Sequence, residues 1–233
     1  MKIASILPYK ENYTKKGSGA VSLWISDFIR NSIYKKNTYI IGSTKNKNYL
    51  TSNYINININ SDNSKFFSTT KKYSNKIIDK IKKLNFDIIE LHNRPIMVKD
   101  FFKKTESKLI LYFHNDPITM KGAKTIDERI NLLKNVDKII FISEWVKKRY
   151  FKDLPVLSDN KTDIIYHSID PIKKVPKKNK QIIFVGKLNE SKGYDLYCKS
   201  MFKILNNNKD WKALSIGEEK RFQNFNTHKN HFN

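Results

Sequence analysis

Two histidine–asparagine pairs stand directly after strand-like stretches of the sequence. One pair, His92-Asn93, follows an apolar run that reads DIIEL, and the other, His114-Asn115, follows a run that reads KLILYF. A predicted helix over 96–104 separates them, so the segment has the pattern of a strand–helix–strand unit. The carboxyl ends of neighbouring parallel strands meet at one edge of a sheet, where ligands bind in such folds. We therefore expect both pairs to lie side by side in a binding site, with hydrogen-bonded structural histidines as the alternative.

A glycine-rich loop lies near the start of the chain. Gly17 and Gly19 precede an amphipathic helix that the apolar spacing predicts over 20–34. Glycines before a helix let backbone N–H groups approach an anion, and the helix dipole favours negative charge there. The loop is therefore a candidate for phosphate binding, and a plain turn is the alternative.

Two lysines near residue 190 form a second candidate for phosphate binding. Lys187 follows a strand predicted over 181–186, and Lys192 opens a helix predicted over 192–205. Both are expected to point to the ligand-binding edge of their own sheet. Cations positioned there stabilise the charge that develops on a departing phosphate group. In a chain so rich in lysine, a solvated loop is the alternative.

Strands and helices alternate along the whole chain. Strands are predicted over 2–7, 38–42, 54–59, 87–91, 108–113, 138–142, 163–166, 181–186 and 211–216. Helices are predicted over 20–34, 65–84, 96–104, 126–134, 144–151 and 192–205, with Ser143 as an N-cap. This alternation indicates an α/β fold with a mostly parallel sheet.

The basic, proline-bearing stretch 171–180 divides the sequence and is predicted to be a linker. The N-terminal domain is assigned to 1–170. A second, incomplete domain is assigned to 181–217, and a polar tail to 218–233.

The composition limits the classes of partner. The 45 basic and 22 acidic residues give a net charge of +23. The excess is almost all lysine, spread along the chain without a basic helix or stripe, and an AT-biased coding sequence would also enrich Lys, Asn and Ile. We therefore expect no nucleic acid as partner. Phosphate-bearing substrates, or peripheral contact with an anionic inner membrane, fit the charge better.

The sequence also bears on localisation and on metals. No apolar run approaches the roughly 18 residues of a membrane-spanning helix, and no secretory segment follows Met1. The one cysteine, Cys198, excludes an internal disulfide and fits a reducing compartment. We predict a cytoplasmic protein, at or near the inner face of the membrane. No Asp-x-Asp follows a strand and no Cys/His cluster has ligand spacing, so no metal is expected.

The ordered set of motifs resembles the family-4 (group 1) retaining glycosyltransferases. The matching segments extend from residue 1 to about Gly217 and read GSGAV, DIIELHNRP, YFHNDP, IIFISEWVKKRY, IIYHSIDP and IIFVGKLNESKGYDL. The resemblance implies an enzyme with a GT-B fold of two Rossmann-like domains, the N-terminal one on the acceptor side. It implies transfer of a sugar from a nucleotide-diphosphate sugar to a glycan or lipid-linked acceptor. HNRP and HNDP are most similar to members that build bacterial surface polysaccharide or lipopolysaccharide.

The resemblance assigns roles to residues of the first domain. His114 matches the catalytic histidine that contacts the donor sugar. His92 and Asn93 match the segment that lines the acceptor side, where Asn115 is placed as well. In this family, retention of configuration is usually explained by attack on the same face of the sugar, assisted by the leaving group. No protein nucleophile and no cofactor are therefore expected.

The resemblance also assigns donor-binding residues. Gly17 and Gly19 match the loop near the donor phosphates, and Lys187 and Lys192 match the pair of cations that hold the diphosphate. The family usually has arginine at the position of Lys187. Lysine keeps the charge but loses the bidentate geometry of a guanidinium.

One family feature has no match in this chain. The family carries two glutamates separated by seven residues downstream of the cation pair, whereas Glu218 and Glu219 are adjacent here. The donor site is therefore expected to be half-built. The alternative function is a non-catalytic binding module or relic that keeps the acceptor-side pocket.

Overall fold

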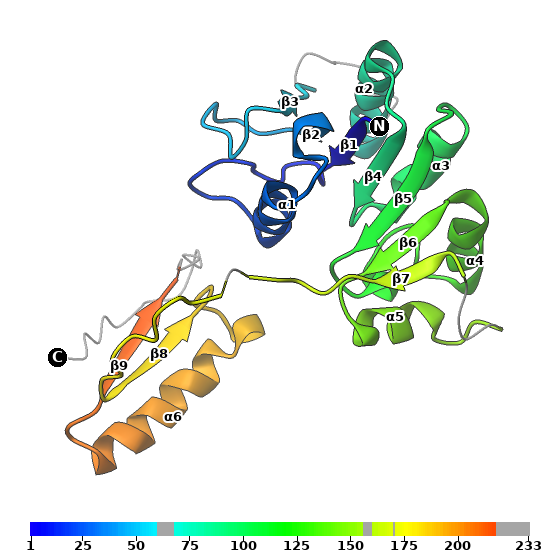
Figure 1. Cartoon of the computed structure of the whole chain (residues 1–233). Coiled ribbons are helices and arrows are strands. Elements are labelled where there is room, and N and C mark those ends of the chain that lie inside the picture. Colours follow the sequence, from blue (N-terminus) through cyan, green and yellow to red (C-terminus); the bar gives the residue numbers. More distant parts are fainter. Residues whose placement is uncertain (60–67, 156–159, 170, 218–233) are drawn as a thin grey trace. The chain divides into compact units, whose positions relative to one another are not determined.

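The computed structural model describes residues 1–59, 68–155, 160–169 and 171–217. The chain divides into two compact units, Met1–Asp170 and Pro171–Asn233. Figure 1 shows the first unit in blue to yellow-green and the second in yellow to orange.

The first unit is built on one seven-stranded sheet in which every strand pairing is parallel. Its strands are β1 Ile3–Ile6, β2 Thr38–Gly42, β3 Tyr54–Asn56, β4 Ile88–His92, β5 Lys108–Phe113, β6 Lys138–Phe141 and β7 Thr162–Ile164. The strand order is β3-β2-β1-β4-β5-β6-β7, so the chain first builds the sheet to one side of β1 and then to the other. The reversal between β1 and β4 is a topological switch point, where ligands bind in open α/β sheets.

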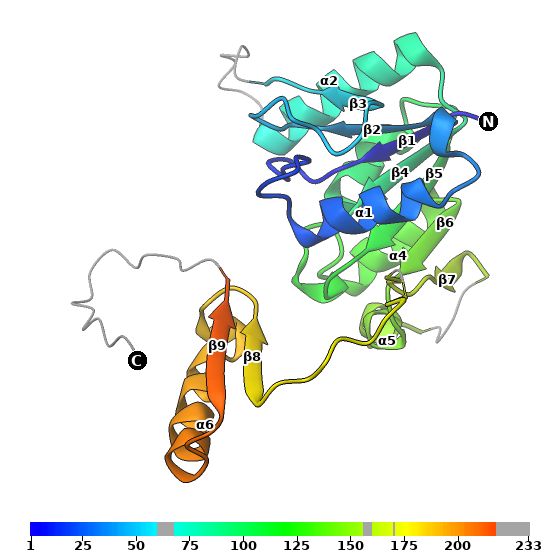
Figure 2. The ribbon, with the colours of Figure 1, turned by 60° about the vertical axis from the view of Figure 1, so that its left-hand side comes forward.

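Helices cover both faces of this sheet. They are α1 Ala20–Arg30, α2 Thr69–Leu84, α3 Val98–Phe102, α4 Ile126–Asn135 and α5 Glu144–Phe151, with short 3₁₀ turns η1 Lys35–Asn37, η2 Pro95–Met97 and η3 Pro117–Thr119. α1 packs on one face through Trp24, Ile25 and Ile29, whereas α2 to α5 contribute to the core on the other face (Figure 2). Right-handed crossovers account for this separation, because the order in which the chain adds strands across the sheet reverses after β3.

Both faces of the central strands are buried, as a parallel sheet requires. β1 is buried along its whole length, and the aliphatic residues of β5 and β6 enter two apolar clusters on opposite sides of the sheet. The larger cluster lies under α2 to α5, and the smaller one lies under α1. The sequence-based prediction of an α/β fold is therefore confirmed.

Several predicted boundaries were wrong in detail. The strand predicted over 54–59 ends at Asn56, although Ile57 and Ile59 are still buried. The helix predicted over 20–34 ends at Arg30, and Ile33 beyond it is 90% exposed, so it gains nothing from packing. Of the helix predicted over 65–84, residues 65–67 lie outside the described residues, and the described part begins after Ser68, whose hydroxyl accepts from the N–H of Lys71.

The helix predicted over 96–104 is also shorter than expected. Pro95 opens a 3₁₀ turn, and α3 itself has five residues. The predicted N-cap at Ser143 is confirmed, because its hydroxyl accepts from the N–H of Val146 at 3.2 Å.

The second unit is a single strand–helix–strand arrangement. It consists of β8 Gln181–Val185, η4 Glu190–Lys192, α6 Tyr194–Asn207 and β9 Lys212–Ile216, with the two strands parallel. Residues 171–180 form no helix or strand. Tyr197 of α6 places its hydroxyl within hydrogen-bonding distance of the carbonyls of Ile182 and Leu214, which fixes the helix against both strands.

In the described part of the chain, no helix is both long and apolar enough to cross a membrane.

Candidate functional site

The two histidine–asparagine pairs meet at the carboxyl edge of the first unit's sheet. β4 ends at His92, β5 ends at Phe113, and the two strands are direct neighbours (Figure 1). His92 lies opposite Tyr112 in this pairing. β4 also borders β1, so the pairs lie beside the switch point of the sheet. The predicted proximity of the pairs is therefore confirmed.

Asn93 joins the two pairs. Its backbone N–H donates to the carbonyl of Tyr112 at 2.9 Å, and its side-chain oxygen accepts from the N–H of His114 at 2.7 Å. Its side-chain nitrogen donates to the side-chain oxygen of Asn115 at 2.9 Å. Asn93 has φ of 53°, a left-handed conformation that asparagine tolerates better than most residues. One side chain thus holds both loops in register.

A hydrogen-bonded chain of imidazoles crosses this edge. The Ser5 hydroxyl lies 2.8 Å from His92 Nε2, and His92 Nδ1 lies 2.9 Å from His114 Nε2. His114 Nδ1 lies 3.4 Å from Nε2 of His167, which follows β7. The exposed fraction is 1% for His92 and 8% for His114, whereas His167 is exposed. This series of hydrogen bonds therefore leads from Ser5, which is buried in β1, to the exposed ring of His167.

Trp24 of α1 packs against all three imidazoles. Its ring centroid lies 6.0 Å from that of His92, 4.8 Å from that of His114 and 5.3 Å from that of His167. On the His92 side, the Tyr112 ring stacks at 4.6 Å. The aromatic walls exclude water from the inner two rings and leave the outer ring to the solvent.

Burial is the main cause of the shifted pKa of His114. It lowers the pKa of His114 to about 2, and the neighbouring His92 and His167 lower it further in the same direction. Burial also lowers the pKa of His167. The pKa of Tyr112 is raised by burial and by the nearby Glu90 carboxylate, to which its hydroxyl donates at 3.2 Å. At neutral pH, His114 is thus an uncharged ring that offers one hydrogen-bond donor and one acceptor.

The glycine-rich loop leads into α1 as predicted. Gly17 has φ of 81°, which favours glycine, and Gly19 is the N-cap of α1. A side chain at Gly19 would collide with the carboxylate of Glu11, so that carboxylate lies against the first turn of the helix. It accepts from the N–H of Ser22 at 3.4 Å. The chain's own negative charge occupies the position predicted for a phosphate, so phosphate binding by Gly17 and Gly19 remains a prediction.

Asp116 has a structural role. Its carboxylate accepts from Nε and Nη2 of Arg149 at 3.0 and 2.9 Å and from the N–H of Ile118. It therefore caps the turn after His114 and ties that turn to α5.

The two lysines of the second unit lie on either side of a loop. Lys187 follows β8 and Gly186 and is exposed, as Lys192 is. The prediction that Lys192 opens a helix was wrong, because it ends the 3₁₀ turn η4 and α6 begins at Tyr194. Gly193, which separates η4 from α6, has φ of 75°, and this left-handed conformation interrupts the helix. Diphosphate binding by Lys187 and Lys192 remains a prediction.

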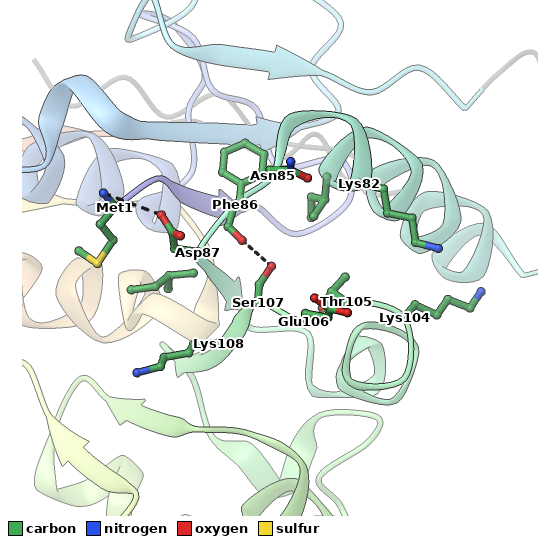
Figure 3. Close-up of a pocket in the computed structure, with 12 residues that line it drawn as sticks. Met1, Lys82, Asn85, Phe86, Asp87, Lys104, Thr105, Glu106, Ser107 and Lys108 are labelled. Atoms are coloured by element: carbon green, nitrogen blue, oxygen red, sulfur yellow. Dashed lines mark hydrogen bonds and ion pairs between the residues drawn. The ribbon is translucent and has the colours of Figure 1, made fainter.

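A separate cavity of about 1060 Å³ opens at the opposite edge of the first sheet. Figure 3 shows it between the segments that enter β4 and β5, where Ser107 donates to the carbonyl of Phe86 and the amino group of Met1 lies near Asp87. No predicted site residue lines it. Because ligands of parallel sheets bind at the carboxyl ends of the strands, the candidate site is the histidine edge.

In residues 1–59, 68–155, 160–169 and 171–217, no group of three His, Cys, Asp or Glu side chains is arranged to hold a metal ion.

Three members of the cluster were given no site role from the sequence. His167 carried a usable signal, because it follows a strand of the same sheet in the way that His92 and His114 do. Ser5 lies inside β1 and Trp24 inside α1. Their patterns indicate only core positions, so neither had a signal that could assign it to the site.

The chain resembles known glycosyltransferases in sequence and in fold. No model of a known protein family matches it. It is 27% identical, in an alignment of 158 residues, to the putative glycosyltransferase YtcC of Bacillus subtilis (strain 168). The alignment covers 59% of this chain and 38% of YtcC, so the chain corresponds to well under half of that curated relative.

Solved structures establish the fold at low sequence identity. A glycosyltransferase from Rickettsia africae ESF-5 aligns with a TM-score of 0.58 and 15% identity, over 93% of this chain and 68% of that protein. HepE from Anabaena, solved in complex with UDP-glucose, aligns with a TM-score of 0.53 and 11% identity, over 94% and 70%. A putative UDP-N-acetylglucosamine 2-epimerase from Listeria monocytogenes also aligns, with a TM-score of 0.53 and 10% identity over 92% and 61%. The chain therefore has a GT-B-like fold, which glycosyltransferases share with epimerases.

Replacement of His114 by glutamine should change how stability depends on pH. The folded ring has a pKa of about 2 and the unfolded ring one near 6.5. Between these values the unfolded chain binds more protons, so the stabilisation is complete above pH 6.5 and is lost as the pH falls. From about pH 7.5 to about pH 5, the free energy of unfolding should fall by about 2 kcal/mol more in the wild type than in His114→Gln.

Urea unfolding at the two pH values measures this difference. His167→Gln is the matched control and should keep most of the wild-type pH dependence, because that ring is exposed. Equal pH dependence in the wild type and in His114→Gln would mean that the buried ring does not resist protonation.

Proposed function

We propose that this chain is a retaining glycosyltransferase that moves a sugar from a nucleotide-diphosphate donor to a glycan or lipid-linked acceptor. The observation that carries the proposal is the convergence of two histidine–asparagine pairs at the switch point of a GT-B-like sheet. The sequence similarity to YtcC supports it, as does the UDP-glucose bound to HepE. The fold alone would not, because epimerases share it.

The first unit is proposed to bind sugar hydroxyls. His114 is neutral, and Asn115 is exposed on the same edge. A neutral imidazole and an amide together offer donors and acceptors without a net charge, which suits an uncharged polyol. We assign His114 to the donor sugar as the catalytic residue, and Asn93 and Asn115 to the acceptor side. We assign His92 to the acceptor side as well, and because its side chain is only 1% exposed, it would act there through its hydrogen bond with His114.

The second unit is proposed to bind the diphosphate. When the bond between the sugar C1 and the phosphate oxygen breaks, the leaving group gains negative charge. Lys187 and Lys192 would stabilise that charge as it develops. The departing oxygen then takes the proton of the acceptor hydroxyl, which attacks C1 from the same face, so configuration is retained without a protein nucleophile. Gly17 and Gly19 would offer backbone N–H groups to the phosphates once the Glu11 carboxylate moves aside.

The net charge of +23 fits an acceptor held at a membrane. A surface rich in lysine is attracted to anionic lipids, and the attraction weakens with salt. We therefore propose a cytoplasmic protein that works at the inner face of the membrane on precursors of surface polysaccharide or lipopolysaccharide.

Nucleoside diphosphates should bind to the chain through the two lysines. Calorimetric titration with UDP, GDP and ADP should give saturable binding of one of them, and Lys192→Ala should weaken it about 10- to 100-fold through loss of a charge-assisted hydrogen bond. Lys187→Ala should act in the same direction. Lys203→Ala, an exposed position of α6 with the same charge change, is the control and should bind as the wild type does. Equal affinity of Lys192→Ala and Lys203→Ala would remove Lys192 from the site.

A panel of nucleotide sugars tests the reaction itself. Release of nucleoside diphosphate in the presence of a glycan or lipid-linked acceptor, followed by mass spectrometry, should occur with at least one donor. His114→Ala should lower turnover by at least about 100-fold, as expected for a group that acts in the transition state. Its effect on the free energy of unfolding is measured in parallel, and an equivalent loss of both would indicate a structural histidine. Diphosphate binding without turnover of any donor would identify a non-catalytic binding module.

A further inference from the structure

The order of the hydrogen bonds in the histidine cluster limits where its protons lie. Each bond between two imidazoles needs an N–H on one side and a lone pair on the other. His114 is neutral, so it carries one N–H: if Nε2 donates to His92, then Nδ1 must accept from His167, and the reverse also holds. With neutral rings, the chain from Ser5 to His167 therefore has two arrangements, in which all bonds point inward or all point outward.

The Glu90 carboxylate distinguishes the two arrangements. One of its oxygens lies 3.9 Å from His92 Nε2, and the other accepts from the Tyr112 hydroxyl. A negative charge at this distance stabilises an N–H at Nε2 and disfavours a lone pair there. His92 would then donate from Nε2 toward Ser5 and Glu90, and its Nδ1 would be left to accept.

No other described contact to His114 opposes this direction. Trp24 presents its ring to the imidazole, and Tyr112 stacks at a centroid distance of 6.2 Å, so neither competes for a ring nitrogen. The Asn93 side chain is already engaged with the backbone N–H of His114 and with Asn115. Among the described contacts, the Glu90 carboxylate, 3.9 Å from His92 Nε2, is thus the charged group that decides the direction of the hydrogen bonds in the cluster.

We propose that the chain from Glu90 and Ser5 through His92 fixes His114 as its Nε2–H tautomer, which directs the Nδ1 lone pair of His114 outward. His167 covers that lone pair in the free protein through a longer bond of 3.4 Å. A ligand hydroxyl that takes the place of His167 would then find an acceptor and would have to donate. This last step rests on the proposed function, whereas the tautomer itself does not.

The proposal gives each residue a distinct role. Glu90, Ser5 and His92 are positioning residues, because they act on the ligand only through His114. His167 donates to Nδ1 of His114 until a ligand hydroxyl takes its place. The chemical class recognised at this point is a polyol that keeps a free hydroxyl there, and an analogue with an ether or a hydrogen in place of that hydroxyl could not donate.

Nitrogen-15 NMR of the full chain tests the tautomer without any substrate. Long-range ¹H–¹⁵N spectra at about pH 8 distinguish a protonated from an unprotonated ring nitrogen, since the unprotonated one resonates far downfield. Single His→Gln variants assign the five histidines. We expect His92, His114 and His167 to be protonated at Nε2 and unprotonated at Nδ1. A proton on Nδ1 of His114, including one that accompanies a cationic His92, would overturn the proposal.

Two variants test which residue sets the tautomer of His114. Glu90→Gln removes the charge with little change of shape, and it should shift both His92 and His114 toward the Nδ1–H tautomer together. Glu106→Gln, an exposed carboxylate with the same charge change, should leave both spectra unchanged. A shift of His92 alone would show that the rings do not act as one chain and would contradict the proposal.

His167→Ala provides the second variant, at an exposed position where the fold is little affected. It should leave the proton of His114 on Nε2 and move the Nδ1 signal further downfield, because the lone pair loses its donor. Protonation of Nδ1 in this variant would mean that His167, and not Glu90, sets the tautomer. Since these outcomes need no donor or acceptor, they remain informative even if no nucleotide sugar is turned over.

Discussion

The parallel pairing of β4 with β5 is the constraint on which the candidate site depends. Its register sets His92 opposite Tyr112, so the residue after β5 reaches the last residue of β4 across one strand spacing. A slip of one residue would turn the His92 ring to the other face of the sheet. Without that register, the Asn93 bonds and the contact between the two imidazoles could not form. The position of α1 over the same edge then closes the cluster through Trp24.

The cluster also shows how a sheet can bury two imidazole rings, those of His92 and His114. Each ring is flanked by aromatic walls, and the nitrogens of the inner two rings have neighbours within hydrogen-bonding distance. Buried polar groups are tolerated under these conditions, because desolvation is offset by hydrogen bonding. The same burial keeps His114 uncharged, so the chemistry of the edge and its stability have one physical cause.

The sequence was sufficient to predict the parts of this fold that follow local rules. Alternation of apolar runs located the strands β1, β2 and β5 closely, and capping chemistry located the start of α5 at Ser143. The approach of His92 to His114 followed from the rule that strand ends share an edge. Boundaries failed where tertiary packing or a single φ angle decided them, as at Ile33 and at Gly193.

Other features could not be predicted, because they depend on contacts between distant segments. Nothing in the local sequence distinguishes Glu11, yet its carboxylate lies at the start of α1. Ser5 and Glu90 lie on neighbouring strands, and only the register of β1 with β4 brings them to the same histidine. The register between strands that are far apart in the sequence leaves no local signal. The contacts of Ser5 and Glu90 with His92 could therefore be found only from the structure.

The contact between Trp24 and the imidazoles has a spectroscopic consequence. An indole beside a neutral imidazole emits differently from one beside an imidazolium ion, which quenches its fluorescence and attracts its π-electrons. The Trp24 ring lies within 4.8 to 6.0 Å of three such rings, one of them open to solvent. The protein therefore carries its own optical reporter at the candidate site. A molecule that displaces His167 would change the light emitted by Trp24 without any added dye.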